Sequence, residues 1–249
     1  MNTREFDGKT AWVTGAGRGI GLATATMLQN NGAQVIGLDM IFGGSHYPFE
    51  CVKLDITDAR MVADTCKELL TQAPPPDVLV NAAGILVQGD CSQVSLDDWR
   101  HCFDVNVNGA FHLLRILIPM FKERRRGAIV NVASNAASVP RLGMAAYCAS
   151  KAALLSLSHC VALEVAPYGV RCNSVSPGST DTPMLAQLMN DSGAVERTLR
   201  GVPEAFRTGI PLGKIAMPEE VAQTILFLAS ERASHITLHD LTVDGGATF

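Results

Sequence analysis

The chain has 249 residues, of which 47% are hydrophobic and 18% are charged, and its formal net charge is −4. These values are typical of one large α/β domain, exclude a disordered chain and give no reason to expect a nucleic-acid partner. The first ten residues lack a hydrophobic signal-peptide core, and no apolar run approaches the roughly 20 residues of a membrane span. The seven cysteines are scattered and odd in number. Because this favours reduced thiols, we expect a cytoplasmic protein.

Strand-like and helix-like segments alternate along the chain. Seven apolar segments are predicted strands: Ala11–Thr14, Gln34–Leu38, Cys51–Leu54, Val78–Asn81, Ala128–Val132, Arg171–Val175 and Leu241–Val243. Helices are predicted at Leu22–Asn30, Trp99–Glu123, Ala146–Ala166 and Pro218–Ser230. This order predicts a single domain, residues 1–249, with an α/β Rossmann fold in which helices flank both faces of a seven-stranded parallel sheet. Ligands of such sheets bind beyond the C-terminal ends of the strands.

A glycine-rich turn, Gly15–Gly21, joins the first predicted strand to the first predicted helix. Glycines let the backbone approach a pyrophosphate closely, and the helix N-terminus stabilises the phosphates. The second strand leads into Asp39, whose carboxylate can accept hydrogen bonds from the adenosine ribose and would repel the 2′-phosphate of NADP. Arg18 is the one feature that favours NADP. We give Asp39 more weight, so NAD is the predicted cofactor.

Tyr147 and Lys151 lie four residues apart, and Ser134 precedes the tyrosine by thirteen residues. Residues at i and i+4 share one helix face, so the phenol and the ammonium can point into the same pocket. A free tyrosine has a pKa of about 10, and a nearby lysine cation is expected to lower it. Ser134 could hydrogen-bond the same substrate oxygen. These groups can move a proton to or from an alcohol or a carbonyl, whereas the two electrons require a redox partner.

From about Phe6 to Gly246 the chain resembles a short-chain dehydrogenase/reductase. The motifs that carry the resemblance are Thr14–Gly21, Asn81–Gly84, Asp104–Val107 and Pro177-Gly178, with alanine in the second place of Asn81–Gly84, where the family often has asparagine. The resemblance implies four catalytic residues: Asn106, Ser134, Tyr147 and Lys151. With the glycine turn and Asp39, it predicts these cofactor contacts: Gly15, Arg18, Gly19, Ile20, Gly21, Asp39, Asp55, Asn81, Ala82, Gly84, Tyr147, Lys151, Pro177, Gly178, Thr180 and Thr182.

Four stretches resemble a narrower group within this family, namely Tyr47–Phe49, Asn81–Leu86, Arg171–Thr182 and Gly209–Val243. That group oxidises a cyclohexadiene diol carboxylate in the biosynthesis of catechol siderophores. The resemblance also implies a homotetramer built on the two long predicted helices. The small-molecule substrate is therefore expected to be a cyclic diol carboxylate.

The expected reaction follows from these roles. Tyr147, as a phenolate, would remove the proton of one ring hydroxyl while a hydride leaves the same carbon, which we take to be C3. Ser134 would hold the oxygen, Lys151 would also hold the nicotinamide ribose, and Asn106 would anchor a water in a proton relay. The resulting ketone would tautomerise to an aromatic catechol, and this gain of aromaticity favours oxidation.

Residues near Tyr147 are candidates to contact the substrate, and we predict Ser134, Arg141, Met144 and Tyr147. Arg141 lies between Ser134 and Tyr147, and a guanidinium can hold a carboxylate with two parallel hydrogen bonds. An exposed or subunit-contact arginine is the alternative for Arg141. Lys214 is a weaker candidate for the carboxylate. Met184 could line the same pocket, although Met144 and Met184 could equally fill gaps in the core.

Several other features have ordinary structural explanations. Pro74-Pro75-Pro76 is expected to form a turn between a helix and a strand, and Arg124-Arg125-Arg126 a solvated cap at a helix C-terminus. Cys148 is expected to be a packed small residue. Segment Ser179–Arg207 is either a mobile lid or an amphipathic helix. The histidines and cysteines show no close ligand spacing, so no metal is expected.

Two alternatives to an NAD-dependent diol dehydrogenase remain at this point. The first is an NADPH-dependent carbonyl reductase of the same fold, such as a 3-oxoacyl reductase, and cofactor preference would separate the two. The second is a catalytically silent nucleotide-binding protein. Asn106, Ser134, Tyr147 and Lys151 argue against it, because a silent protein has no need of all four.

Overall fold

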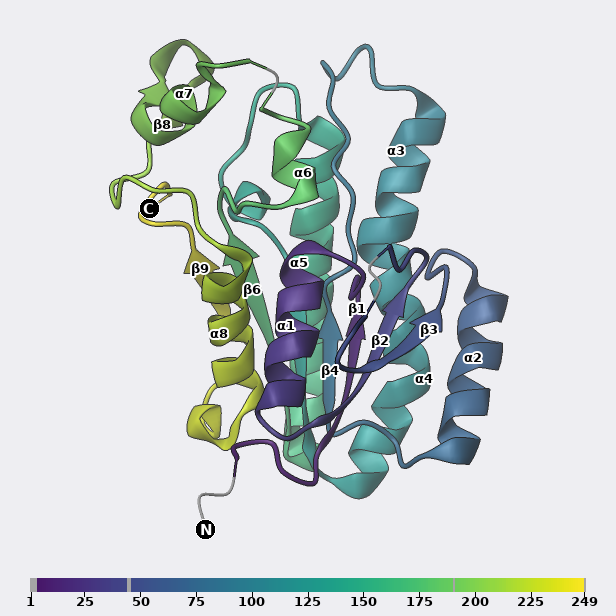
Figure 1. Ribbon diagram of the computed structural model, residues 1–249. Coiled ribbons are helices and arrows are strands. Elements are labelled where there is room, and N and C mark those ends of the chain that lie inside the picture. The colour runs from purple at the N-terminus through teal and green to yellow at the C-terminus, as the bar shows by residue number, and fades with distance from the viewer. Residues whose placement is uncertain (1–3, 44–45, 190, 249) are drawn as a thin grey trace.

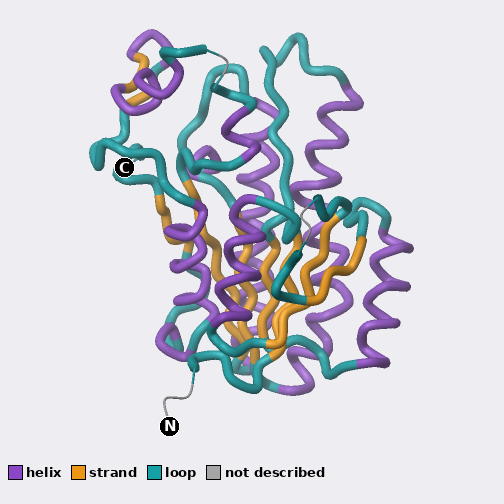
Figure 2. Tube along the Cα trace, in the orientation of Figure 1, coloured by secondary structure: helices purple, strands orange, loops and turns teal. Residues whose placement is uncertain are grey.

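The computed structural model describes residues 4–43, 46–189 and 191–248. A central sheet lies between two layers of helices (Figures 1 and 2). All seven of its strands are parallel, in the spatial order β3-β2-β1-β4-β5-β6-β9. The predicted fold is therefore confirmed. The strands are β1 (Thr10–Thr14), β2 (Gln34–Asp39), β3 (Glu50–Lys53), β4 (Val78–Asn81), β5 (Gly127–Val132), β6 (Val170–Pro177) and β9 (Asp240–Val243).

Two hydrophobic cores lie on opposite faces of this sheet. Helices α1 (Gly19–Asn30) and α8 (Pro218–Ala229) cover one face, and α2 (Ala59–Gln72), α4 (Gly109–Arg124) and α5 (Ala145–Val165) cover the other. Side chains of a strand alternate between the faces, so Trp12 and Val13 of β1 pack into different cores. Because both faces are covered, the strands are apolar along most of their length.

The predicted helix Trp99–Glu123 is not continuous. It consists of α3 (Leu96–Phe103), a π-helical turn over Asp104–Asn108, and α4. Its start at Leu96 is set by Ser95, whose Oγ accepts a hydrogen bond from Asp98 N at 3.0 Å. The interruption places the side chain of Asn106 in the protein interior, where it is 1% exposed. Single π-helical turns often occur at functional sites.

Helix α5 carries both Tyr147 and Lys151. With the turn that follows it, Ala145–Tyr168, it is the one helix in the described part of the chain that is long and apolar enough to cross a membrane by length and composition. The helix packs on β6. An 18-residue window within it has a mean hydropathy of 1.3, and 39% of that window is buried inside the protein.

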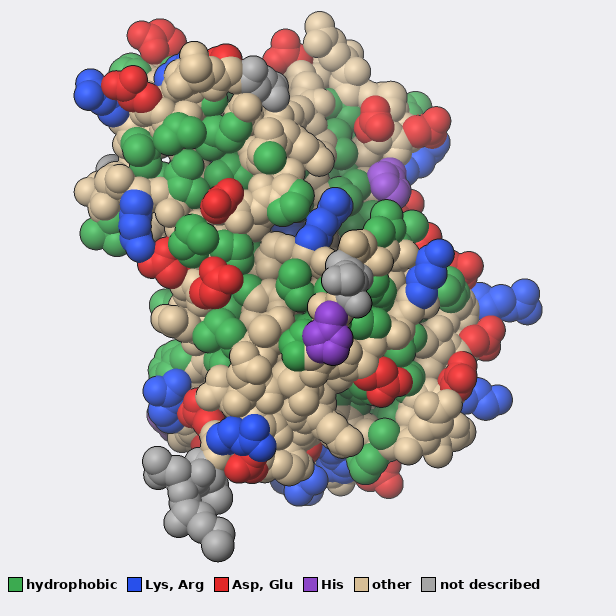
Figure 3. Space-filling model, viewed as in Figure 1, with side chains coloured by type: hydrophobic (Ala, Val, Ile, Leu, Met, Phe, Trp, Pro, Cys, Tyr) green, Lys and Arg blue, Asp and Glu red, His purple; other side chains and the backbone are tan. Residues whose placement is uncertain are grey.

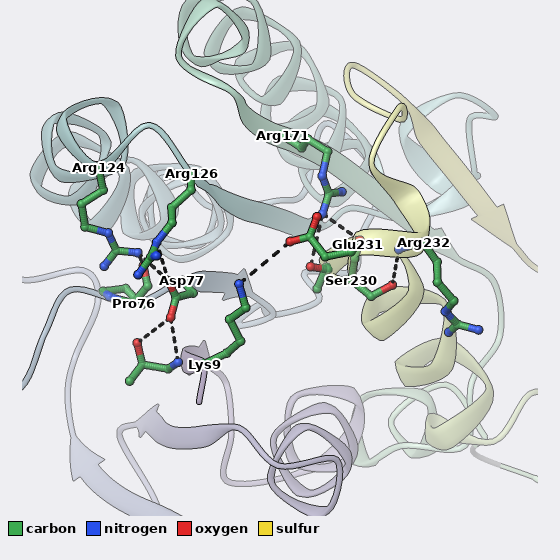
Figure 4. Close-up of polar contacts among 11 residues, drawn as sticks. Lys9, Pro76, Asp77, Arg124, Arg126, Arg171, Ser230, Glu231 and Arg232 are labelled. Carbon is green, nitrogen blue, oxygen red and sulfur yellow. Dashed lines mark hydrogen bonds and ion pairs between the residues drawn. The ribbon is translucent and has the colours of Figure 1, made fainter. Parts of the chain in front are cut away.

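A polar cluster closes the N-terminal end of the sheet, opposite the predicted site (Figure 4). Arg124, which is 20% exposed, donates to the carbonyl oxygens of Pro75 and Pro76 and pairs with Asp77 at 2.8 Å. Arg126 pairs with the same carboxylate. The prediction of a solvated cap is therefore wrong for Arg124, which ties α4 to the loop before β4. The three prolines do form the helix–strand turn, between α2 and β4.

The irregular segment 179–208 forms a small lobe beyond the C-terminal ends of the strands (Figure 1). It contains α6 (Pro183–Ala186), α7 (Ala194–Arg200) and an antiparallel hairpin of β7 (Gly201–Val202) and β8 (Arg207–Thr208). Asn190, which interrupts the predicted segment, lies outside the described residues. Hydrophobic side chains gather where this lobe meets the body of the molecule (Figure 3).

Candidate active site

A cavity of about 250 Å³ opens at the C-terminal ends of the strands, beneath the lobe. It collects predicted residues from five separate parts of the chain, because parallel strands deliver their following loops to one edge. The predicted residues that line it are Ile20, Ala82, Gly84, Ser134, Arg141, Met144, Tyr147, Lys151, Pro177, Gly178, Thr180 and Thr182. Met184 lines it as well. Tyr147 and Ser134 are 8% and 7% exposed, so their hydroxyls lie in a largely desolvated place.

The phenol of Tyr147 shares a side-chain hydrogen bond with Ser134. Burial raises the pKa of Tyr147 to about 12, and the Ser134 hydrogen bond opposes this rise only in part. The expected lowering of this pKa by Lys151 is not found, and desolvation of the phenolate is the dominant influence. The arrangement nevertheless offers two hydroxyls that could hold one substrate oxygen.

The ammonium of Lys151 is 5.9 Å from the centre of the Tyr147 ring and donates to the carbonyl oxygen of Val132 at 2.9 Å. Lys151 is 3% exposed, and this burial lowers its pKa to about 8. The lysine is therefore a cation at neutral pH that gives up its proton more easily than a surface lysine.

Asn106 is held by a network of buried hydrogen bonds. Its Oδ1 accepts from Ile85 N at 2.8 Å, and its Nδ2 donates to Ile85 O at 3.0 Å and to Ser150 Oγ at 2.9 Å. Ser150 in turn donates to Tyr147 O at 2.8 Å. Sequence reasoning missed Ser150, although its place between Tyr147 and Lys151 on the same helix was visible. The side chain of Asn106 thus joins the loop after β4 to the helix that carries the tyrosine.

The glycine turn is shaped by close backbone contacts. A Cβ at Gly15, where φ is +70°, would lie 2.8 Å from the backbone of Ala83. Gly19 has φ +56°, and a Cβ there would lie 3.2 Å from Thr182 Cγ2, so the turn and Thr182, another predicted cofactor contact, are neighbours. Helix α1 has no acidic residue in its first turn and no side-chain cap. Its N-terminal N–H groups fit a phosphate.

Asp39 lies at the end of β2 beside this turn. Its Oδ2 accepts from Gly17 N at 2.9 Å and its Oδ1 from Ile41 N at 3.1 Å. A carboxylate has about four acceptor positions, so capacity remains for ribose hydroxyls. Arg18 is exposed at the start of α1. Asp55 accepts from the backbone and the hydroxyl of Thr57 and lies outside the cavity lining.

Asn81 is buried below the cavity and does not line it. Its Nδ2 donates to Asn131 Oδ1 at 2.7 Å, and its own Oδ1 has no partner among the described residues. Thr14, which was not predicted as a site residue, accepts from Ala82 N and Ala83 N at 3.1 and 3.2 Å. These bonds fix the loop after β4 against the glycine turn.

Arg207 is a cavity residue that sequence reasoning did not single out. It begins β8 in the lobe, and it lines the cavity together with Arg141. By contrast, Lys214 pairs with Glu220 at an exposed position outside the lining, and Cys148 is also outside the lining. The described residues contain no group of three or more His, Cys, Asp or Glu that could hold a metal ion, and the absence of a metal stays a prediction.

Comparison with known proteins agrees with this geometry. A family profile described as Enoyl-(Acyl carrier protein) reductase matches residues 15–248. The chain is 55% identical, over 98% of both chains, to the 2,3-dihydro-2,3-dihydroxybenzoate dehydrogenase of Escherichia coli. It is 40% identical to the vibriobactin-specific enzyme of that name from Vibrio cholerae, over 95% of this chain and 94% of the relative.

A solved structure with the same fold is the aldohexose dehydrogenase of Thermoplasma acidophilum. It superposes with a TM-score of 0.87 at 32% sequence identity and covers 99% of this chain and 96% of its own. The fold, the serine, tyrosine and lysine in one cavity, and the extent of these matches lead to one conclusion. The chain belongs to the short-chain dehydrogenase/reductase family.

Proposed function

We propose that the protein is an NAD-dependent dehydrogenase that oxidises 2,3-dihydro-2,3-dihydroxybenzoate to 2,3-dihydroxybenzoate in the biosynthesis of a catechol siderophore. The observation that carries the proposal is the meeting of Ser134, Tyr147 and Lys151 with Ile20 and Thr182 in one cavity. The printed names of the relatives from Escherichia coli and Vibrio cholerae support this choice of substrate.

The residues present fit a dinucleotide. Gly15 and Gly19 adopt positive φ in the turn before α1, and Asp39 lies where an adenosine ribose would be held. NAD, when bound, would supply the hydride acceptor and a positive charge. The residues that would hold it are Gly15, Arg18, Gly19, Ile20, Gly21, Asp39, Asp55, Asn81, Ala82, Gly84, Tyr147, Lys151, Pro177, Gly178, Thr180 and Thr182.

In the proposed reaction a hydride leaves C3 of the diol and the proton of the C3 hydroxyl passes to Tyr147 Oη. Ser134 would hold the same oxygen through a hydrogen bond, and Lys151 would hold the nicotinamide ribose. Asn106 would act in the proton relay through its backbone carbonyl, because its side chain is already bonded to Ile85 and Ser150. Transfer of the C2 proton to the C3 oxygen, by way of solvent, then converts the ketone into the catechol.

The cavity residues proposed to contact the substrate are Ser134, Arg141, Met144 and Tyr147. An NADPH-dependent 3-oxoacyl-type reductase is the second candidate, and relatives whose printed name is 3-oxoacyl-[acyl-carrier-protein] reductase, 32% and 34% identical to this chain, support it less strongly. A reductase of that kind would prefer NADPH, whereas the carboxylate of Asp39 opposes a 2′-phosphate.

The assay that tests the proposal is NADH formation with 2,3-dihydro-2,3-dihydroxybenzoate, with NADP and with 3-oxoacyl substrates in parallel. Rapid oxidation of the diol acid with NAD, and slow reaction with NADPH and a 3-oxoacyl thioester, is the expected result. Preferential reduction of the thioester by NADPH would replace the first function by the second.

The protein is further proposed to be a cytoplasmic homotetramer that assembles through α4 and α5. Phe111 on α4 is 45% exposed and Leu163 on α5 is 64% exposed, and burial of such apolar side chains stabilises subunit contacts. All seven cysteines are free, which suits a reducing compartment. Light scattering should give four times the chain mass of 26.5 kDa.

A further inference from the structure

Two arginines face the same cavity without a counterion. Arg141 lies in the loop between Ser134 and Tyr147, and Arg207 begins β8 in the lobe, yet both line the cavity that holds Ser134 and Tyr147. Neither guanidinium has an ion pair or a side-chain hydrogen bond with any residue that the structure describes. On the same lobe, Arg200 pairs with Glu196.

The two charges act on each other. Partial burial lowers the pKa of Arg141, and the charge of Arg207 lowers it further. Asp244 is the nearby carboxylate that opposes this effect, but its oxygens already accept from Asn135 Nδ2 at 3.1 Å and Thr248 Oγ1 at 2.6 Å. Asp244 forms no ion pair with either arginine.

Two like charges in a partly desolvated cavity repel each other and destabilise the empty arrangement. An anion between them would remove this cost. A guanidinium presents a planar set of donors that matches a carboxylate, and a carboxylate has enough acceptor positions for two guanidiniums. The same cavity has an apolar wall from Met144, Met184 and Leu188, which suits a flat ring.

We propose that Arg141 and Arg207 together bind the carboxylate of the substrate, with the ring against the methionine wall and the reacting hydroxyl at Ser134 and Tyr147. The identity of the anion as a ring carboxylate rests on the proposed function. The pair would make the enzyme select acids over neutral diols. Because Arg207 comes from the lobe and Arg141 from the loop before α5, a carboxylate bound by both would link these two segments. A neutral diol would not.

Binding of the product and of its neutral counterpart tests the proposal without any turnover. Calorimetry would compare 2,3-dihydroxybenzoate with catechol on the wild type, Arg141→Gln, Arg207→Gln and the double variant, in the presence of NAD. Arg207→Lys keeps a charge without the planar fork, and Arg200→Gln is the matched control on the same lobe. Melting temperature and NAD affinity report whether each variant is intact.

Each single substitution to Gln should weaken 2,3-dihydroxybenzoate binding by about 10- to 100-fold, as expected for loss of a charged hydrogen-bond partner. Catechol binding should stay close to that of the wild type, and Arg200→Gln should bind both compounds normally. Arg207→Lys should fall between the wild type and Arg207→Gln. Unchanged acid binding in Arg207→Gln, or an equal loss of catechol binding, would overturn the two-arginine site.

Kinetics with the diol acid separate this inference from the proposed function. If the wild type oxidises the diol acid and both single variants retain its kcat/KM, the function stands and the arginine site is wrong. If the wild type does not oxidise it, but both variants lose binding of 2,3-dihydroxybenzoate and not of catechol, the carboxylate site stands and the assigned substrate is wrong.

Discussion

Lys151 lies one helical turn beyond Tyr147 on α5, with its ammonium 5.9 Å from the centre of the phenol ring and bonded to Val132 O. Burial shifts the pKa values of the two groups in opposite directions, because it disfavours the phenolate of Tyr147 and the ammonium of Lys151. The pKa of Tyr147 is raised to about 12 and that of Lys151 is lowered to about 8. The helix therefore presents a neutral phenol beside a cation that titrates near neutrality.

Replacement of Tyr147 by Phe should lower kcat for the diol acid by about 10² or more, as expected for loss of a general base. The variant should fold normally and bind NAD with wild-type affinity, because a single hydroxyl is removed. Steady-state kinetics and calorimetry would measure the two effects. Near-normal turnover in the purified variant would remove Tyr147 from the mechanism.

The rate of oxidation should rise with pH. The phenolate of Tyr147 is the base, and because its pKa is raised, only a small fraction is ionised at neutral pH. The measurement is kcat/KM for the diol acid between neutral and alkaline pH, with carbonyl reduction as the reverse reaction. Reduction uses the phenol as an acid and should not share the rise. A flat oxidation profile would contradict the assignment of the base.

Lys151→Met should change how stability depends on pH. The folded pKa of about 8 lies below the ordinary value of 10.5, so the unfolded chain binds more protons between these limits and wild-type stability gains with rising pH. Below pH 8 the buried charge of Lys151 lowers the free energy of unfolding of the wild type by up to about 3 kcal/mol. Urea unfolding should therefore show the advantage of the variant shrinking from pH 8 to 10.5. Lys53→Met, at an exposed site, is the control, and an advantage that does not vary with pH would refute the buried cation.

Substitution of Asp39 by Asn should weaken NAD binding by about 1.5–3 kcal/mol, the range for hydrogen bonds to a charged group. NADP binding should weaken less or improve, because the carboxylate that repels a 2′-phosphate is gone. Asp64→Asn is the matched control, since Asp64 is exposed on α2 and is not among the proposed cofactor contacts. The test is titration of both cofactors. A wild type that already prefers NADP would show that Asp39 has been misassigned.

Asn106→Ala should reduce the free energy of unfolding by about 2–4 kcal/mol, because it leaves the partly buried backbone N–H and carbonyl of Ile85 without partners. Turnover should fall as well, since the loop after β4 loses its tie to α5. Asn108→Ala is the control, because Asn108 is exposed and bonds only to Asp104. Its effect should stay within about 0.5 kcal/mol. Equal stability of the two variants in urea would contradict the buried network.

Local pattern was enough to predict much of this molecule. The strand Val78–Asn81 has the predicted bounds because its apolar run is short and its turn signals are clear. The sequence predicted one continuous helix at Trp99–Glu123 and did not predict the π-helical turn within it. That turn is stabilised by contacts of Asn106 with Ile85 and Ser150, which are distant along the chain. The short helices α6 and α7 have too few residues for a periodic pattern.

The sequence by itself determined the fold, the family and the meeting of Tyr147 with Lys151, because i and i+4 residues share a helix face whatever surrounds them. Only the tertiary structure decided how those groups titrate, since desolvation depends on all the elements that cover them. It also brought Arg207 into the cavity that Arg141 lines, through the β7–β8 hairpin, and neither spacing nor periodicity predicts this proximity. Local geometry follows from neighbouring residues, whereas burial and charge–charge contact depend on chain segments that meet only on folding.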